Sequence, residues 1–168
     1  MANYSDEAQS FRYEVRNEAE QSIKDLRIDR ANFREAPKTE WESVIKRFYY
    51  TFIDYENHPK IHLEYLWLHF RENLRYTGHI QNGVDTADWT EFVGKINELI
   101  PKENRPAEYY YINDQGWVYE GKLPEIIRVL GDCSARIEDF YILPKRGRFD
   151  WVVCYCGDGD GIGIYLRK

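Results

Sequence analysis

Two aspartates close to the end of the sequence have the spacing of calcium ligands. Asp158 and Asp160 lie in the run Gly157-Asp-Gly-Asp-Gly161, and Ca²⁺ is commonly held by closely spaced carboxylate oxygens. An EF-hand loop needs a further acidic ligand and a downstream Glu, which this run lacks. Gly and Asp also favour the backbone conformations of tight turns. We therefore expect a turn between two strands, with Asp158 and Asp160 as the alternative metal site and no cofactor.

The histidines give a weaker indication of zinc chemistry. His58 and His62 have the i,i+4 spacing of a helical metal pair, but Pro59 lies between them and disfavours a continuous helix. His62-Leu-Glu64 matches the first half of a zinc-deaminase signature, whose second half, Pro-Cys-x-x-Cys, does not follow. We expect these histidines to be surface or hydrogen-bonded side chains rather than metal ligands.

The cysteines do not form a recognisable nucleophilic site. The chain has three, Cys133, Cys154 and Cys156. Cys154 and Cys156 are two residues apart on an expected strand, so both point to the same face and are poorly placed for a mutual disulfide. Neither Gly-x-Ser-x-Gly nor Ser-x-x-Lys occurs in the sequence. We expect reduced, buried thiols, a cytoplasmic location and no catalytic residue.

An aromatic run offers a more specific hypothesis. Tyr109, Tyr110 and Tyr111 are consecutive, so their rings must alternate between the two faces of a strand. Unless helices cover both faces, some of these rings form an exposed platform, and Tyr and Trp are enriched in interface hot spots. The short basic cluster Lys145-Arg146-Gly-Arg148 could grip a carboxylate or phosphate, although a solvated loop is the simpler interpretation. The expected partner-binding residues are Tyr109, Tyr111, Trp117, Tyr119, Lys145, Arg146 and Arg148.

Charge and hydropathy exclude two classes of partner. The formal net charge is −6 and the isoelectric point is about 5.3, with no basic tail of the kind that neutralises nucleic-acid phosphates. An acidic surface is compatible with a basic protein partner. The apolar runs are far shorter than a membrane span. We expect another protein as the partner, with neither nucleic acid nor membrane.

The first 100 residues have helical periodicity. Apolar residues spaced by three and four predict a helix from Asp6 to Arg27. A second is expected from Glu40 to Tyr55, with Thr39 and Glu42 forming a capping box. The stretch Lys60–Leu74 has helical spacing but is dense enough in apolar residues to hide a strand; we expect a helix. A further helix is expected over Thr86–Leu99, capped by Asp85 or Thr86.

From about residue 106 the period changes to that of strands. A hairpin is expected over Tyr109–Asn113 and Trp117–Glu120, followed by a short helix over Lys122–Leu130. Further strands are expected over Asp139–Leu143, Asp150–Cys156 and Ile162–Leu166. The fold class is thus α+β: a single domain over residues 1–168, with helices in about 1–100 packed on a mostly antiparallel sheet of about five strands in about 106–168, with one inserted short helix.

A set of motifs in the second half of the chain has a recognisable order. They are Trp117-Val-Tyr-Glu-Gly121, Ile126-Ile-Arg-Val-Leu130, Cys133, Phe140-Tyr-Ile142 with Lys145, and Phe149-Asp-Trp151 with Cys154. With these motifs, residues 85–164 resemble an uncharacterised bacterial domain family. The resemblance implies a small α+β domain without an established activity, similar in size and style to immunity proteins of toxin systems. Where such a domain would have a Cys-Glu-Asn-His-His-Asp run, this chain has Cys154-Tyr-Cys-Gly-Asp-Gly-Asp160, so any chemistry that depends on the histidine pair is lost.

Three functions follow from these patterns. The first is a non-catalytic protein-binding module, immunity-like or regulatory, that uses an aromatic sheet face and an acidic surface. The alternative is a small-molecule or metal-dependent enzyme built around Asp158 and Asp160 or the histidines. The third is a structural oligomer in which an exposed final strand pairs across a two-fold axis.

Overall fold

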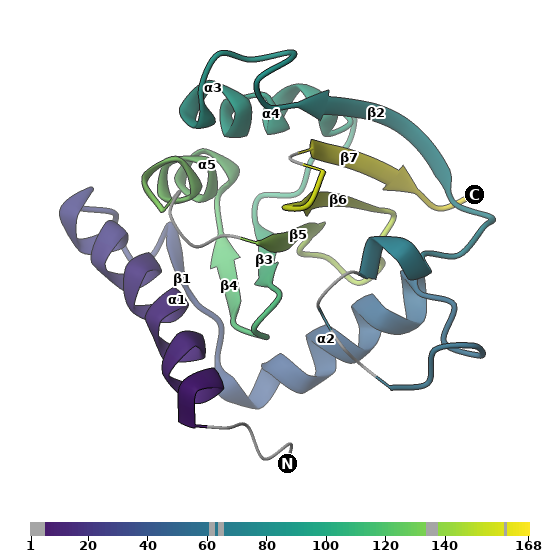
Figure 1. Ribbon diagram of the computed structural model, residues 1–168, viewed down its shortest axis with the longest axis horizontal. Helices are drawn as coiled ribbons and strands as arrows, with labels where there is room; N and C mark the ends of the chain where they lie inside the picture. Colours follow the sequence, from purple (N-terminus) through teal and green to yellow (C-terminus); the bar gives the residue numbers. More distant parts are fainter. Residues whose placement is uncertain (1–5, 61–62, 64–65, 134–137, 160) are drawn as a thin grey trace.

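A seven-stranded antiparallel sheet organises the chain (Figure 1). The computed structural model describes residues 6–60, 63, 66–133, 138–159 and 161–168, with the side chains of the first helix described from Tyr13 onward. The strand order is β1-β4-β3-β5-β6-β7-β2. The strands are β1 (Phe33–Glu35), β2 (Arg75–Gln81), β3 (Tyr109–Asn113), β4 (Val118–Gly121), β5 (Asp139–Pro144), β6 (Trp151–Cys156) and β7 (Gly161–Leu166).

Helices cover both faces of this sheet. The helix α2 (Lys38–Phe52) packs on one face, where it buries Phe48 and Phe52 against strand residues such as Tyr141. Figure 1 shows α2 and the short 3₁₀ helix η1 (Leu66–His69) on one side of the strands and the other helices on the opposite side. Those helices are α1 (Asp6–Asp25), α3 (Trp89–Gly94), α4 (Ile96–Leu99) and α5 (Leu123–Asp132).

The α+β class, the antiparallel sheet and most helices agree with the sequence analysis, but the sheet has seven strands rather than about five. The expectation was wrong at both edges. No strand was expected over Phe33–Glu35, which forms edge strand β1 and pairs with β4. Arg75–Gln81 forms the other edge, β2, paired with β7. An edge strand with one solvated side needs no apolar alternation, and most residues of β2 are exposed.

The expected helix over Lys60–Leu74 is also wrong. Within the described part of this stretch only Leu66–His69 is helical, as the 3₁₀ helix η1. Phe70 forms an isolated bridge with Ile53, which ties the stretch to the end of α2. The apolar residues Leu63 and Leu66 are buried in the α2-side core. The apolar spacing therefore reflects packing beneath a loop rather than a helical face.

Two helix starts differ from their expected caps. Helix α2 begins after Pro37, without a side-chain cap, and Glu42 pairs with Lys46 instead of reaching back to Thr39. Helix α3 is capped by Asp88, whose carboxylate accepts from the Glu91 amide, rather than by Asp85 or Thr86. The final strand β7 lies between β6 and β2, so it is not the exposed edge that the oligomer hypothesis requires.

We predict that Gly121→Ala destabilises the protein by about 1–3 kcal/mol, the usual range for overpacking. A Cβ at this position in β4 would clash with the Asn32 carbonyl oxygen and lie 2.7 Å from Phe33 Cα. Both are backbone atoms of the β1 region, so they cannot rotate away from the new methyl group as a side chain could. Urea unfolding of the two proteins measures the difference.

The matched control is Gly94→Ala, since a Cβ there meets nothing within 4 Å. In α3 it should stabilise by about 0.5–1 kcal/mol, because Ala loses less backbone entropy than Gly in a helix. Equal stabilities for the two variants would contradict close packing of β1 on β4.

Candidate functional site

The aromatic ladder does not form a surface. Tyr109, Tyr111 and Tyr119 belong to the core on the side of α1 and α5, and the intervening Tyr110 belongs to the α2-side core. Their exposed fractions are between 0% and 7%. Because helices cover both faces of the sheet, the expectation of an exposed platform is wrong.

Trp117 is also buried, at 4% exposure. Its ring meets Trp41 edge-on at 5.1 Å between centroids and lies beneath the guanidinium of Arg16. The Tyr119 hydroxyl donates to Glu20 at 3.0 Å, and burial raises the pKa of Tyr119 above its ordinary value. These side chains hold α1 and the start of α2 against the sheet.

The expected basic cluster divides into three different environments. Lys145 Nζ lies 2.6 Å from Glu120 and 3.3 Å from Glu108, and Arg34 pairs with the same two carboxylates. Glu120 is only 4% exposed in its side chain. Lys145 is thus neutralised within a four-member ion network across β1, β4 and the ends of β3 and β5.

The other two cations of the cluster are not engaged in this network. The carbonyl of Arg146, with that of Gly147, accepts from Arg47 of α2. Arg148 is 67% exposed in its side chain and lies 3.4 Å from Asp150. The three residues therefore do not act together as a gripping cluster.

No metal site is found among the described residues: no group of three His, Cys, Asp or Glu side chains could hold an ion. Asp158 lies exposed in the β6–β7 turn, whereas Asp160, His62 and Glu64 lie outside the described residues. His58 and His69 stack with ring centroids 3.8 Å apart, a pairing that the sequence spacing did not indicate.

The cysteines differ in accessibility. Cys133 and Cys154 are buried, and Cys156 is partly exposed. Burial raises the pKa of the Cys133 thiol to about 11, since it outweighs the hydrogen bond with Ser22. Burial also raises the pKa values of Cys154 and Cys156 above the ordinary thiol range. These shifts disfavour the reactive thiolate form.

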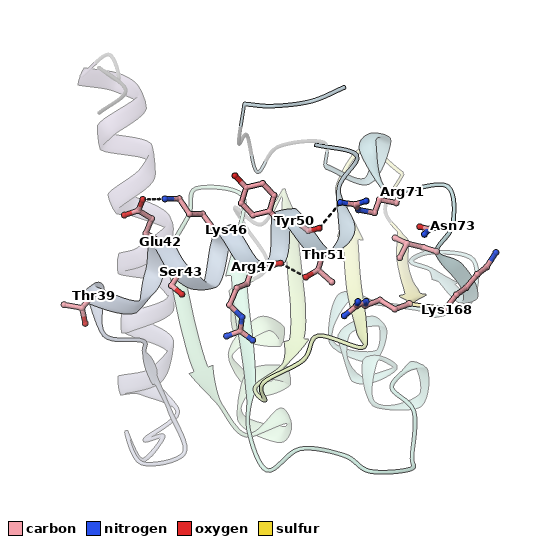
Figure 2. A pocket seen from close by; sticks show the side chains of 12 residues that line it. Thr39, Glu42, Ser43, Lys46, Arg47, Tyr50, Thr51, Arg71, Asn73 and Lys168 are labelled. Atoms are coloured by element: carbon pink, nitrogen blue, oxygen red, sulfur yellow. Dashed lines mark hydrogen bonds and ion pairs between the residues drawn. The ribbon is translucent and has the colours of Figure 1, made fainter. Parts of the chain in front are cut away.

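A groove of about 830 Å³ lies on the outer side of α2 (Figure 2). Successive turns of the α2 surface form one wall. The segment before β2 and the residues that follow β7 complete it. Its lining residues are Thr39, Glu42, Ser43, Lys46, Arg47, Tyr50, Thr51, Arg71, Asn73, Leu74, Arg167 and Lys168.

The groove is cationic although the chain is acidic. Five Lys or Arg side chains and one Glu line it, while the whole chain has a net charge of −6. Lys46 is paired with Glu42 at 2.5 Å. The remaining four cations come from three segments that are distant in sequence, so no local run of charged residues indicates a cationic site.

Two of these cations are held in place by neutral groups. Arg47 donates to the Arg146 and Gly147 carbonyls at 3.2 and 3.1 Å, and its guanidinium lies 4.4 Å from the centre of the Phe149 ring. Arg167 donates to the Phe149 carbonyl at 3.4 Å. The β5–β6 loop therefore positions both guanidinium groups.

Arg71 is held beside the C-terminal end of α2. It donates to the Tyr50 carbonyl at 2.9 Å, and its guanidinium lies 4.9 Å from the centre of the Tyr55 ring. Its Nε is buried without a hydrogen-bond partner. Tyr50 is 54% exposed and Tyr55 is 37% exposed, and the two rings meet edge-on. This corner combines a fixed cation with exposed aromatic area, as in interface hot spots.

Within the described part of the chain, Arg47, Arg71 and Arg167 have no carboxylate within ion-pair distance. Their positions are set by carbonyl groups and rings, which satisfy some donors without a direct ion pair, although Arg71 is close enough to Asp54 to help lower the pKa of that carboxyl. A guanidinium fixed in this way is pre-organised for the carboxylate or phosphate of a ligand.

The fold and groove define an α+β protein with a single two-sided sheet and a cationic surface groove. The chain belongs to a family of unknown function (DUF6756), whose model matches residues 11–168. No curated protein matches it, and no solved structure does. No helix in the described part of the chain is long and apolar enough to cross a membrane.

We predict that Lys145→Ala lowers the free energy of unfolding by about 1.5–3 kcal/mol, the usual value of hydrogen bonds to charged groups. Among the described residues, the change leaves the buried Glu120 with Arg34 as its remaining ion-pair partner. Arg148→Ala, from the same stretch, should change stability by no more than about 0.5 kcal/mol because the side chain is exposed. Urea unfolding at pH 7 compares them, and equal effects would contradict the division of the cluster.

The ion network also predicts acid sensitivity. Burial raises the pKa of Glu108, but Lys145 and Arg34 outweigh it and hold the pKa below the ordinary 4.5. A depressed carboxylate pKa stabilises the fold above the unfolded-state pKa, and that contribution is lost as pH falls through the folded-state value. The stability gap between the wild type and Glu108→Gln should therefore be constant above about pH 5.5 and narrow toward pH 3. A gap that widens toward pH 3 would contradict this assignment.

Proposed function

We propose that the protein is a non-catalytic protein-binding module whose cationic groove takes an acidic segment of a partner protein. The observation that carries the proposal is the set Arg47, Arg71 and Arg167, fixed by carbonyls and rings without carboxylate partners. An acidic segment supplies the missing counter-charges. The exposed rings of Tyr50 and Tyr55 supply apolar contact area beside them.

This proposal changes the binding surface expected from the sequence. The tyrosines of β3 are buried, so a partner meets the outer side of α2 rather than a sheet face. The sign of the partner's charge also reverses: the groove favours an acidic ligand, whereas the net charge alone favours a basic one. A role in masking a partner, as in immunity or regulatory proteins, and a place in the bacterial cytoplasm are part of the proposal.

A polypeptide suits the groove better than a nucleic acid. Nucleic-acid binding depends on many phosphate contacts and on basic surface spread along a strand. Here the cations are confined to a groove in a chain of net charge −6, and the rest of the surface would repel a long polyanion. A short run of Asp and Glu side chains matches the limited extent of the site.

Fluorescence anisotropy with a labelled twelve-residue Glu-rich peptide tests the proposal. The wild type should bind it, and the affinity should fall as salt rises because the contacts are ionic. Arg47→Gln with Arg71→Gln should weaken binding about tenfold or more, since each charge-assisted hydrogen bond contributes about 1.5–3 kcal/mol. A third variant, Arg71→Lys, keeps the positive charge but loses the planar guanidinium group that can donate two parallel hydrogen bonds. It should bind the peptide more weakly than the wild type and more tightly than the double variant.

The matched control is Lys24→Gln with Lys102→Gln, which removes two exposed cations elsewhere. It should change affinity less than about twofold, because such surface charges interact weakly. Equal losses in both double variants would show that net charge, not the groove, governs binding. Tighter binding of a Lys-rich peptide or of a single-stranded oligonucleotide would also overturn the proposal, and unfolding midpoints exclude loss of fold as the cause.

A further inference from the structure

A second hollow lies over the β6–β7–β2 end of the sheet, apart from the lining residues of the groove. Its volume is about 220 Å³. Residues of β2, β6 and β7 line it, together with Trp67 of η1. We call it the recess. Its lining includes aromatic rings, an imidazole, thiols and three glycines.

Two glycines of β7 make room for rings that wall this recess. A Cβ at Gly161 would lie 2.6 Å from His79 Nε2, and a Cβ at Gly163 would lie 2.7 Å from Tyr76 Cε2. The imidazole and the phenol ring therefore rest directly on the strand backbone. Register pairs Gly163 with both Cys154 and His79, so a residue without a side chain separates the thiol from the imidazole. The glycines thus set the position of two walls of the recess.

The charge of the lining decides what kind of molecule fits. None of the described lining residues is Lys, Arg, Asp or Glu. An ion entering the recess would lose hydration without gaining a counter-charge, which is costly. The recess therefore favours an uncharged ligand, in contrast to the cationic groove.

The walls favour a flat ring. Tyr76 and Tyr165 lie 5.0 Å apart between ring centroids, and Tyr165 also contacts Phe70 edge-on. Aromatic rings pair with other rings in offset or edge-on arrangements. His79 and the thiol of Cys156 add polar atoms. Trp67 adds a further aromatic ring to the lining.

We propose that the recess is a binding site for a small uncharged heteroaromatic molecule of one or two fused rings. Its volume is below the roughly 300 Å³ at which ligand pockets usually begin, so a larger molecule would not be enclosed. The rings of Tyr76, Tyr165 and Trp67 contact the faces or edges of the ligand ring, and His79 meets its polar atoms. This site does not depend on the groove or on its ligand.

The partly exposed thiol of Cys156 allows a direct test. Cys133 and Cys154 are buried, so iodoacetamide should label Cys156 first in the folded protein, as identified by peptide mass spectrometry. Adenine, indole and nicotinamide serve as heteroaromatic probes, and cyclohexanemethanol as an uncharged non-aromatic control. At least one heteroaromatic probe should slow labelling saturably, by about tenfold at ten times its dissociation constant.

Glycine substitutions tie this protection to the recess. Gly161→Ala and Gly163→Ala displace the ends of the exposed His79 and Tyr76 side chains, which can turn away, so the fold should survive and the protection should be lost. Gly147→Ala is the control, since a Cβ there meets nothing within 4 Å, and it should keep full protection. The proposal is overturned if none of the three probes protects Cys156 at 10 mM, if cyclohexanemethanol protects equally, or if Gly163→Ala retains the protection.

Discussion

The burial of both faces of the sheet is the constraint on which the rest of the structure depends. All five residues of β3 are buried, so consecutive tyrosines enter two different cores rather than one core and solvent. Tyr111 and Tyr119 need α1 and α5 above them, and Tyr110 and Tyr141 need α2 on the other side. Once these rings are covered, the central strands offer no surface to a ligand. Binding must then occur on the outer side of a helix or where the helical cover ends.

Both hollows satisfy this constraint in different ways. The groove uses the solvent side of α2, whose buried side is committed to the sheet. The recess lies on the same face of the sheet as α2, where β2 and β7 extend beyond the rings that α2 covers and glycines replace side chains. Their linings are chemically opposite, since the groove is dominated by cations and the recess carries no formal charge among its described residues. One ligand could not satisfy both.

The sequence predicts the central strands and the helices well because their apolar spacing reports burial directly. The hairpin of β3 and β4, the helix α5 and strands β5 to β7 lie close to the expected residues. The edges were missed for a physical reason. In β2, Arg75 and Thr77 face solvent and Gly78 packs against Leu99, so neither alternation nor β-branched enrichment marks the strand. The three-residue β1 is too short for any periodic signal.

The availability of a cation depends on its counter-ion more than on its exposure, and this is why the residues that we propose to bind a partner could not be read from the sequence. Lys145 and Arg47 are both partly exposed, and the sequence singled out Lys145 because it stands in a basic cluster. In the structure Lys145 is compensated by Glu108 and Glu120, whose chain positions are 37 and 25 residues away. Arg47, by contrast, contacts carbonyls and a ring and forms no ion pair with the described residues. These ion pairs form because β3 lies between β4 and β5 in the sheet. A local pattern of charges in the sequence cannot indicate them. A cation that the fold positions without neutralising retains its attraction for an external carboxylate, whatever its neighbours in sequence.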